Sequence, residues 1–230
     1  MRILALIPAR GGSKRLPGKN IRLLGGKPLI VWTVDVAKLI SEICDIMVST
    51  DSVQIKEVAQ EAGAYVPWLR PDKLSSDESS SADAALHALD WYETNHGKVD
   101  GLLLLQPTSP FRTSTSIKEG IKLYSKFKTN TVIGVSPTHE HPNLIFKIKQ
   151  GALTTFFDKN GLNIRSQDLE PAFIVNGSFY LISPKNLRKN KSFFIDPLTP
   201  LIINSKIESI DIDTEEDLHY AKYCLNVEKN

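Results

Sequence analysis

The chain has 230 residues, of which 41% are hydrophobic and 23% are charged, and this is typical of a globular protein that buries a full core. The formal net charge of only +2 excludes the clustered excess of lysine and arginine that marks a nucleic-acid-binding surface. No apolar run approaches the ~20 residues that cross a bilayer, so we expect neither a nucleic acid nor a membrane among its partners.

Short apolar runs alternate with segments of helical spacing up to about residue 136. The predicted strands are Arg2–Ile7, Ile46–Ser49, Gly101–Leu105 and Thr131–Val135, and the predicted helices are Leu29–Ile40, Val53–Ala62, Ser79–Trp91 and Ser116–Phe127. Strands that alternate with helices in this way indicate βαβ units and a parallel sheet. Such sheets bind ligands at the carboxyl ends of their strands, so we expect functional side chains in the loops that follow them.

The alternation of strand and helix stops in the segment 137–170. This segment mixes His, Pro, Asn and Gly with two strand-like pieces, Leu144–Ile148 and Leu153–Phe157, which predicts a hairpin arm inserted into the domain. Its scattered apolar side chains need a cover: Leu144, Ile145, Phe146, Leu153, Phe156 and Phe157. Exposed apolar residues of this kind usually mark an interface, so the arm is predicted to form an isologous homodimer.

After the arm the sheet is expected to resume at Phe173–Ile182, and Glu215–Leu225 predicts an amphipathic C-terminal helix. We therefore predict a single domain over residues 1–230. The two cysteines, Cys44 and Cys224, stand far apart without metal-binding or redox spacing. This usage predicts a cytoplasmic protein without a disulfide framework.

The segment 8–20 follows the first predicted strand and reads Pro-Ala-Arg-Gly-Gly-Ser-Lys-Arg-Leu-Pro-Gly-Lys-Asn. Its glycines allow backbone amides to approach phosphate oxygens, and Arg10, Lys14 and Lys19 can neutralise the charge that builds during phosphoryl transfer. The spacing is not that of a Walker A loop. A solvated turn-rich loop is the alternative, but the position directly after a buried strand favours phosphate binding.

The second candidate is the carboxylate pair Asp211 and Asp213. Residues two apart in an extended segment face the same side, and two carboxylates suit Mg²⁺, whose other ligands are water and substrate phosphates. Spacing alone favours another interpretation, in which Asp213 is a helix N-cap and Glu216 completes a capping box. The two functions are compatible, because a capping carboxylate can spare an oxygen for a metal.

Three further segments combine polar side chains with turn residues. They are Arg70–Ser79 ahead of a predicted helix, Leu105–Arg112 at the end of the most buried strand, and Val175–Tyr180 in the resumed strand. The first also fits simple helix capping, and the other two also fit rigid turns without a catalytic role. The polar side chains of the second segment are expected to project into the cleft: Gln106, Thr108, Ser109 and Arg112.

In combination these segments resemble the CMP-sialic acid synthetases, the acylneuraminate cytidylyltransferases, from Ile7 to about Leu218. The matching motifs, in the family's order and spacing, are Ala9–Asn20, Arg70–Ser81, Leu104–Pro110, Asn176–Gly177 and Asp211–Thr214. The resemblance implies an α/β, Rossmann-like, mostly parallel sheet flanked by helices, with a protruding arm that dimerises the chain. It also implies transfer of CMP from CTP to the anomeric hydroxyl of a nonulosonic acid of the N-acetylneuraminate type, with Mg²⁺ as cofactor and pyrophosphate as product.

The same resemblance implies roles for individual residues. The nucleotide-binding set would be Ala9, Arg10, Gly11, Gly12, Ser13, Lys14, Lys19, Asn20, Arg70, Ser79 and Ser81, with Arg70 and the backbone near Ser79 reading cytosine. The sugar-binding set would be Gln106, Arg165, Asn176 and Tyr180. The catalytic set would be Lys14, Lys19, Asp211 and Asp213, of which the two aspartates would bind Mg²⁺.

Three departures from the family pattern concern the acceptor sugar. Arg165-Ser166 replaces a pair of basic residues, Asn143-Leu144-Ile145 follows Pro142 where some members have lysine, and Ile174-Val175 replaces an Arg-Pro step. They leave legionaminate and pseudaminate open as alternative acceptors. A non-catalytic nucleotide-binding module is a third alternative, which the Asp pair and the basic loop disfavour.

Overall fold

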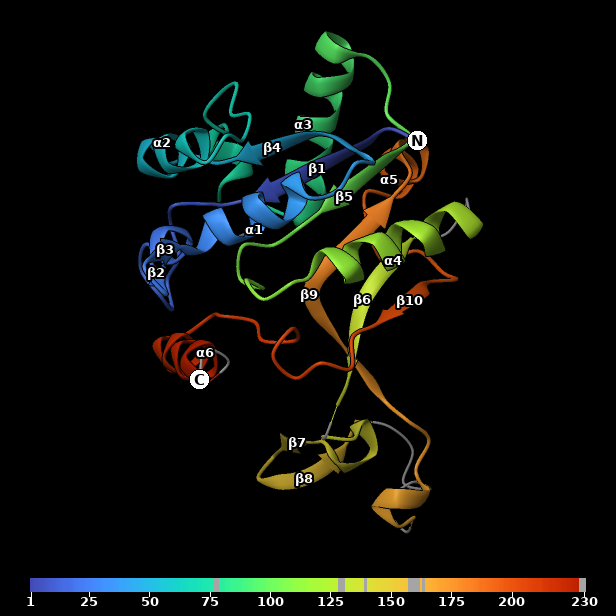
Figure 1. Ribbon diagram of the computed structural model, residues 1–230. Coiled ribbons are helices and arrows are strands. Elements are labelled where there is room, and N and C mark those ends of the chain that lie inside the picture. Colours follow the sequence, from blue (N-terminus) through green and yellow to red (C-terminus); the bar gives the residue numbers. More distant parts are fainter. Residues whose placement is uncertain (77–78, 128–130, 139, 157–161, 163, 228–230) are drawn as a thin grey trace.

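Six strands of the described chain form one mixed sheet with helices on both faces (Figure 1). The computed structural model describes residues 1–76, 79–127, 131–138, 140–156, 162 and 164–227. In spatial order the strands are β10 (Thr199–Ile202), β6 (Val132–Pro137), β9 (Phe173–Ile182), β5 (Gly101–Leu104), β1 (Ile3–Pro8) and β4 (Ile43–Ser49). Neighbours run parallel except for β9, which is antiparallel to both β5 and β6. The predicted α/β class and mostly parallel sheet are confirmed, whereas β10 has no counterpart among the predicted strands.

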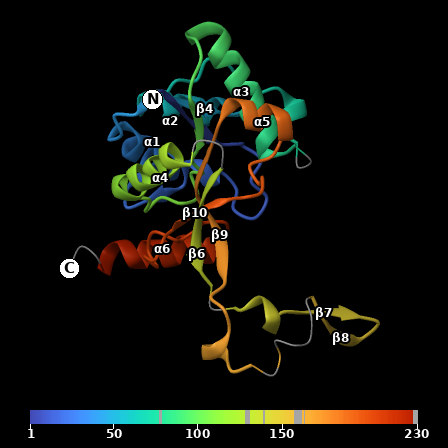
Figure 2. The ribbon, with the colours of Figure 1, turned by 90° about the vertical axis from the view of Figure 1, so that its right-hand side faces the viewer.

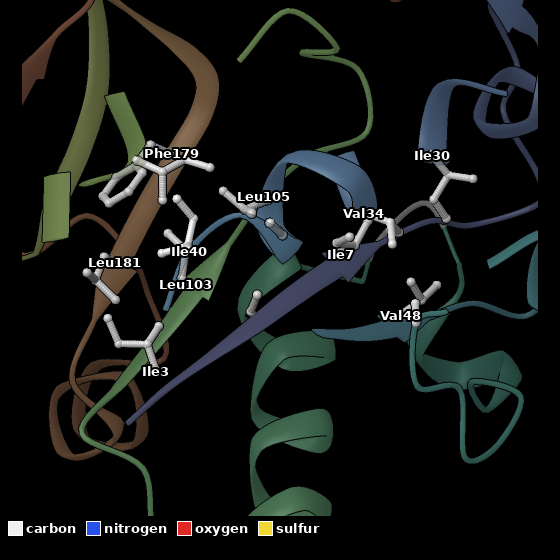
Figure 3. Close-up of a cluster of buried hydrophobic side chains, with 14 of the residues drawn as sticks. Ile3, Ile7, Ile30, Val34, Ile40, Val48, Leu103, Leu105, Phe179 and Leu181 are labelled. Carbon is white, nitrogen blue, oxygen red and sulfur yellow. The ribbon is translucent and has the colours of Figure 1, made fainter. Parts of the chain in front are cut away.

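The sheet separates two hydrophobic cores, because successive side chains of a strand point to opposite faces. Helices α1 (Leu29–Lys38), α2 (Val53–Glu61) and α4 (Ser114–Lys126) cover one face, and α3 (Ser81–His96) and α5 (Pro184–Asn190) cover the other (Figure 2). Ile3 and Ile7 of β1 lie in the first core (Figure 3), and Leu4 and Leu6 lie in the second. All four are fully buried, and burial of each such side chain stabilises the fold by about 1.5–3 kcal/mol.

A third, smaller core joins the C-terminal helix α6 (Glu215–Val227) to the loop that follows β1. Its buried members are Leu16, Leu24, Leu29, Ile210, Ile212, Leu218, Ala221 and Cys224. The loop also contains the short helix η1 (Lys19–Ile21) and the hairpin of β2 (Leu23–Leu24) and β3 (Lys27–Pro28). This core therefore holds the extended segment before α6 against the basic loop.

The arm stands away from the sheet in both ribbon views (Figures 1 and 2). It contains the antiparallel hairpin of β7 (Phe146–Lys149) and β8 (Ala152–Thr155) and the short helices η3 (Pro142–Leu144) and η5 (Ser166–Asp168). Strands β6 and β9 lead into and out of it. The predicted hairpin is therefore confirmed, and its apolar side chains Leu144, Ile145, Phe146, Leu153 and Phe156 are exposed. Phe157, the end of the second predicted strand, lies outside the described residues.

Side-chain caps set the helix starts more closely than hydrophobic periodicity does. The Ser80 side chain accepts from the amide of Asp83, so α3 begins at Ser81, two residues after the predicted start. Thr113 caps α4 by accepting from the amide of Ser116. One further short helix, η2, covers Asp72–Leu74. Across the described ranges, every helix is too short or too polar to cross a bilayer.

Candidate active site

A cleft of about 600 Å³ opens where β1 and β5 end. Its walls come from the basic loop after β1, the start of α3 with the segment before it, the loop after β5, and the segment before α6. The predicted site residues that line it are Arg10, Ser13, Lys14, Lys19, Asn20, Arg70, Ser79, Ser81, Gln106, Asp211 and Asp213. The predicted residues outside this lining are Ala9, Gly11, Gly12, Arg165, Asn176 and Tyr180. Parallel sheets bind their ligands at this edge.

The basic loop owes its shape to its own backbone and to two polar side chains. The Gly11 amide donates to the Asp51 carboxylate (2.7 Å), and the Asn20 side-chain amide donates to the Arg10 carbonyl (2.9 Å). Gly18 sits at φ +66°, in the left-handed region that favours glycine. These contacts fix the loop while the side chains of its cations, Arg10, Lys14, Arg15 and Lys19, line the cleft.

Asp213 carries two ion pairs at the centre of this wall. Its carboxylate accepts from the Lys19 ammonium at 2.6 Å and from the Arg15 guanidinium at 2.5 Å. Its side chain is 31% exposed and that of Lys19 is 15% exposed, so the pair is only partly screened by solvent. Arg15 is a site residue that sequence reasoning does not single out, although its place in the basic run is a signal for it.

The predicted capping role of Asp213 is wrong by one residue. The Asp217 carboxylate accepts from the amides of Asp213 (3.0 Å) and Thr214 (2.8 Å) and from the Thr214 hydroxyl (2.9 Å). Thr214 in turn accepts from the Asp217 amide (3.2 Å), which completes a capping box at Thr214 in place of Asp213 and Glu216. The Asp213 carboxylate is thereby left to the cleft.

Asp211 lies beside Asp213 on the same wall, where the Ile212 amide donates to the Thr108 carbonyl (2.8 Å). Burial raises the pKa of Asp211 above its ordinary value, the Thr108 hydrogen bond opposes this, and the Asp213 charge adds to it. The residue is nonetheless exposed to solvent at the cleft that it lines. The raised pKa makes the Asp211 carboxylate a better proton acceptor than an ordinary aspartate.

The two carboxylates form a partial ligand set for a hard cation. Among the described residues, no group of three or more His, Cys, Asp and Glu side chains could hold a metal on its own. Mg²⁺ characteristically binds one or two carboxylates and takes its remaining ligands from substrate phosphates and water. Asp211 and Asp213 fit that pattern, because they line the same cleft as the cations of the basic loop, which can bind phosphates.

Arg70 also lines the cleft and is only 7% exposed. Its amide donates to the Thr50 carbonyl (2.6 Å), and its guanidinium donates to the carbonyls of Ser49 (2.7 Å) and Leu74 (3.4 Å). Burial lowers the pKa of Arg70, with Asp51 opposing this effect. Among the described residues the Nε atom has no hydrogen-bond partner, so within this part of the chain the buried guanidinium retains a donor.

Of the four predicted sugar-binding residues, Gln106 lines the cleft, two are buried on β9 and one lies in the arm. Asn176 is 6% exposed; its side-chain amide donates to the Ser136 hydroxyl (2.9 Å), and its oxygen accepts from the Ser178 amide (3.1 Å) and hydroxyl (2.7 Å). Tyr180 is 9% exposed and belongs to the second core. Arg165 is exposed next to η5. Their contact with a sugar stays a prediction.

Arg112 does not project into the cleft as expected. It is 4% exposed and lies beneath the loop after β5, outside the cleft lining. Its guanidinium donates to the carbonyls of Gln106 (2.9 Å) and Ser178 (2.5 Å) and to the Thr33 hydroxyl (3.3 Å). The physical reason is that two backbone carbonyls, one from the loop after β5 and one from β9, supply acceptors for it inside the fold.

Similarity to known proteins covers almost the whole chain. A family model described as Cytidylyltransferase matches residues 4–221. The chain is 46% identical over 219 residues to the CMP-N,N'-diacetyllegionaminic acid synthase of Legionella pneumophila, covering 94% of this chain and 93% of that protein. It is 36% identical over 219 residues to the N-acylneuraminate cytidylyltransferase of Streptococcus agalactiae serotype V, covering 94% of this chain but 52% of that longer protein.

The fold has a solved counterpart. The structure of CMP:2-keto-3-deoxy-manno-octonic acid synthetase complexed with CTP superposes with a TM-score of 0.74 over 99% of this chain and 100% of that one. At 15% sequence identity this likeness concerns the fold alone. The family is shown by the match of the family model and by the identity to the sequence relatives. The chain therefore belongs to the cytidylyltransferase family and is a nucleotidyltransferase of its acylneuraminate group.

Proposed function

We propose that the protein transfers CMP from CTP to the anomeric hydroxyl of a nonulosonic acid and releases pyrophosphate. The observation that carries this proposal is the composition of the cleft. Cations of the basic loop, the Asp211 and Asp213 carboxylates, and the buried Arg70 guanidinium line one cavity of about 600 Å³. That volume suits a nucleotide with an acceptor beside it. Family membership supports the same chemistry.

The cleft would act through position and charge. The sugar hydroxyl would attack the α-phosphorus of CTP, and the bond to the β-phosphate oxygen would break. Arg10, Lys14 and Lys19 would neutralise the charge that grows on the phosphate oxygens and on the leaving pyrophosphate. Asp211, whose pKa is raised by burial, would accept the proton of the attacking hydroxyl.

Asp211 and Asp213 are also the residues that would hold Mg²⁺. The ion would supply Lewis-acid polarisation of the phosphate oxygens. Asp213 would then give up its ion pairs with Lys19 and Arg15 in favour of the metal ion. Both cations line the cleft, so they would be able to contact the phosphates instead. Removal of divalent cations with a chelator should abolish turnover, and re-addition of Mg²⁺ should restore it.

For the acceptor we propose a legionaminate-type sugar with two N-acetyl groups. The motifs of the sequence alone favour N-acetylneuraminate, but the 46% identity to a legionaminic acid synthase exceeds the 36% identity to an N-acylneuraminate enzyme. The departures from the family pattern put exposed apolar side chains at Leu144, Ile145, Ile174 and Val175. Apolar contacts suit a second N-acetyl group better than a chain of hydroxyl groups.

A panel of acceptors tests both levels of this proposal. Pyrophosphate release would be followed with CTP, Mg²⁺ and either N,N'-diacetyllegionaminate, N-acetylneuraminate or pseudaminate. We expect the highest kcat/KM with N,N'-diacetyllegionaminate, by about tenfold or more, because one additional or missing group in a pocket changes kcat/KM by roughly 10–200-fold. A preference for another sugar would overturn the choice of acceptor. No release with any sugar, despite CTP binding, would instead favour a non-catalytic nucleotide-binding module.

We also propose that the arm joins two chains into a dimer. The hairpin β7–β8 stands clear of the sheet, and its side chains Phe146, Ile148 and Leu153 are 40%, 75% and 71% exposed. Apolar side chains in such a position are stabilised when a second copy covers them. In this arrangement Arg165 or Lys147 would approach the sugar of the neighbouring chain.

A further inference from the structure

The side chain of Gln106, which lines the cleft, lies against a glycine of β9. Gly177 adopts φ +72°, and a Cβ atom built there would lie 2.4 Å from the Gln106 side-chain oxygen and 3.6 Å from the Ser109 hydroxyl. No side chain other than hydrogen leaves room for Gln106 in its present conformation. The Ser109 hydroxyl donates to the Asn176 carbonyl (3.4 Å), so the loop after β5 and β9 are also linked directly.

Gly177 reaches Gln106 because β9 bulges at this point. Pairing between β6 and β9 jumps from Ile133 opposite Tyr180 to Val135 opposite Val175, which leaves additional residues on β9. Hydrogen bonds within the bulge fix its shape, since the Asn176 side-chain oxygen accepts from the Ser178 amide and hydroxyl. The bulge therefore has a fixed shape, and it places the backbone of Gly177 against the Gln106 side chain.

Arg112 ties this bulge to the loop that carries Gln106. Its Nε donates to the Ser178 carbonyl of the bulge, and its Nη2 donates to the Gln106 carbonyl itself. Its third contact, from Nη1 to the Thr33 hydroxyl of α1, involves neither the loop nor the bulge. Burial lowers the pKa of Arg112 to about 9, with Glu208 opposing this, so the guanidinium is still charged at neutral pH. A charged donor forms stronger hydrogen bonds than a neutral one.

We propose that Arg112 and Gly177 are positioning residues that set the conformation of Gln106, and thereby the affinity for the acceptor sugar. Arg112 fixes the backbone of Gln106 through a hydrogen bond to its carbonyl, and the backbone of Gly177 is the surface against which the Gln106 side chain lies. Neither residue lines the cleft. The proposal rests on the proposed function in one respect: the sugar whose affinity changes is the nonulosonic acid.

Two variants perturb the arrangement from different sides. Gly177→Ala pushes the far end of the flexible Gln106 side chain out of its place. Arg112→Lys keeps a positive charge but lacks the planar fork that reaches Gln106 and Ser178 together. We expect each to raise the KM for the sugar by about tenfold, the equivalent of one lost hydrogen bond, while the KM for CTP stays within twofold.

Two matched controls separate positioning from stability. Gly26→Ala introduces the same strain at φ +81°, but its Cβ would have no neighbour within 4 Å. Thr33→Val removes the Arg112 contact that does not involve the loop or the bulge. Both controls should lower the melting temperature and leave the KM for the sugar unchanged.

A double-mutant cycle with Gln106→Ala gives the sharpest test. If Gly177 and Arg112 act through the Gln106 side chain, neither Gly177→Ala nor Arg112→Lys changes the KM for the sugar further in the Gln106→Ala background. Equal effects in both backgrounds, or equal rises in the KM for CTP and for the sugar, would overturn the proposal.

A readout without turnover keeps this inference distinct from the proposed function. The side-chain amide resonance of Gln106, identified by its loss in Gln106→Ala, should shift in Gly177→Ala and Arg112→Lys and stay in place in Gly26→Ala. An unmoved resonance in both test variants contradicts the positioning of Gln106 whatever the enzyme acts on. Failure of the wild-type protein to turn over any sugar, with the resonance shifting as expected, would instead refute the proposed function.

Discussion

Two aspartates near the start of α6, Asp213 and Asp217, are four residues apart and are predicted to have different roles. The Asp213 carboxylate contacts Lys19 and Arg15 in the cleft, and the Asp217 carboxylate caps the helix. We therefore predict that Asp213→Ala abolishes most turnover with little change in stability. Asp217→Ala should lower stability and keep most of the turnover.

The structure gives a magnitude for each change. Loss of a capping group costs about 1 kcal/mol of stability, in the range 0.5–2. In a chain of this length, 1 kcal/mol shifts the melting temperature by about 2–4 °C. The ion pair of Asp213 with Arg15, whose side chains are 31% and 69% exposed, contributes at most about 1 kcal/mol. The pair with Lys19 is less exposed, but Asp213 itself remains open to the cleft, so the loss of stability is expected to stay small. Loss of one charged group that stabilises a transition state slows turnover by about 100-fold or more.

Both variants can be assayed in one preparation series. Melting temperature would be measured by calorimetry, and pyrophosphate release would be measured with CTP and Mg²⁺ well below the melting temperatures. Melting temperatures in acid solution also test the role of Asp217 as a cap. Burial raises the pKa of Asp217, but hydrogen bonds from Asp213 and Thr214 outweigh this effect and lower the pKa below its ordinary value. A depressed pKa means that the cap stabilises the fold above the carboxyl's unfolded pKa and is lost as pH falls through the folded value. Full activity of Asp213→Ala, with only a lower melting temperature, would refute this division of roles.

Three other outcomes are expected. CTP should be turned over at least about 100-fold faster than UTP, because a site built for one polar base edge rejects a base that leaves its donors unpaired; equal initial rates would contradict a base-reading cleft. Mixing an Asp211→Ala chain with an Arg165→Ala chain should give activity above either parent if subunits share sites, whereas no gain after verified subunit exchange, or a monomer by light scattering, would show that each chain works alone. Burial raises the pKa of Glu93, but contacts with Lys98 and Arg188 outweigh this effect and leave the pKa below its ordinary value. Its ion pairs therefore stabilise the fold above about pH 4.5 and are lost in more acid solution. Glu93→Gln should flatten the acid limb of the melting-temperature profile.

The parts of the fold that follow from the sequence are those with strong local patterns. The apolar run 101–105 is buried throughout, as its composition predicts. β10 is missed because it has four residues and contains Pro200, which an edge strand tolerates and a pattern search reads as a break. The reversed direction of β9 is also invisible, since an alternating pattern carries no information about which way a strand runs.

The cleft is anticipated to the extent that its residues sit in loops after strands. The basic loop and the aspartate pair line the same cleft, at the edge where the carboxyl ends of parallel strands meet, and their contact with a substrate stays a prediction. The orientation of Arg112 is not predictable in this way, since its acceptors come from segments as far apart as Thr33 and Ser178. The cap at Thr214 differs in this respect, because Thr214 and Asp217 have the Thr-x-x-Asp spacing of a capping box and are visible in the sequence.

The third core has a consequence for how this enzyme would lose activity. Leu16, Ile210, Ile212 and Leu218 form a cluster separate from the two that bury the sheet. Units of this kind open by local unfolding without dissolving the rest of the molecule. Helix α6 could therefore detach at a temperature where the sheet is still native, and the basic loop and Asp213 would separate with it. Hydrogen exchange at the amides of α6 should then be faster than in β1 and β5, and a nucleotide that bridges the two segments should slow it.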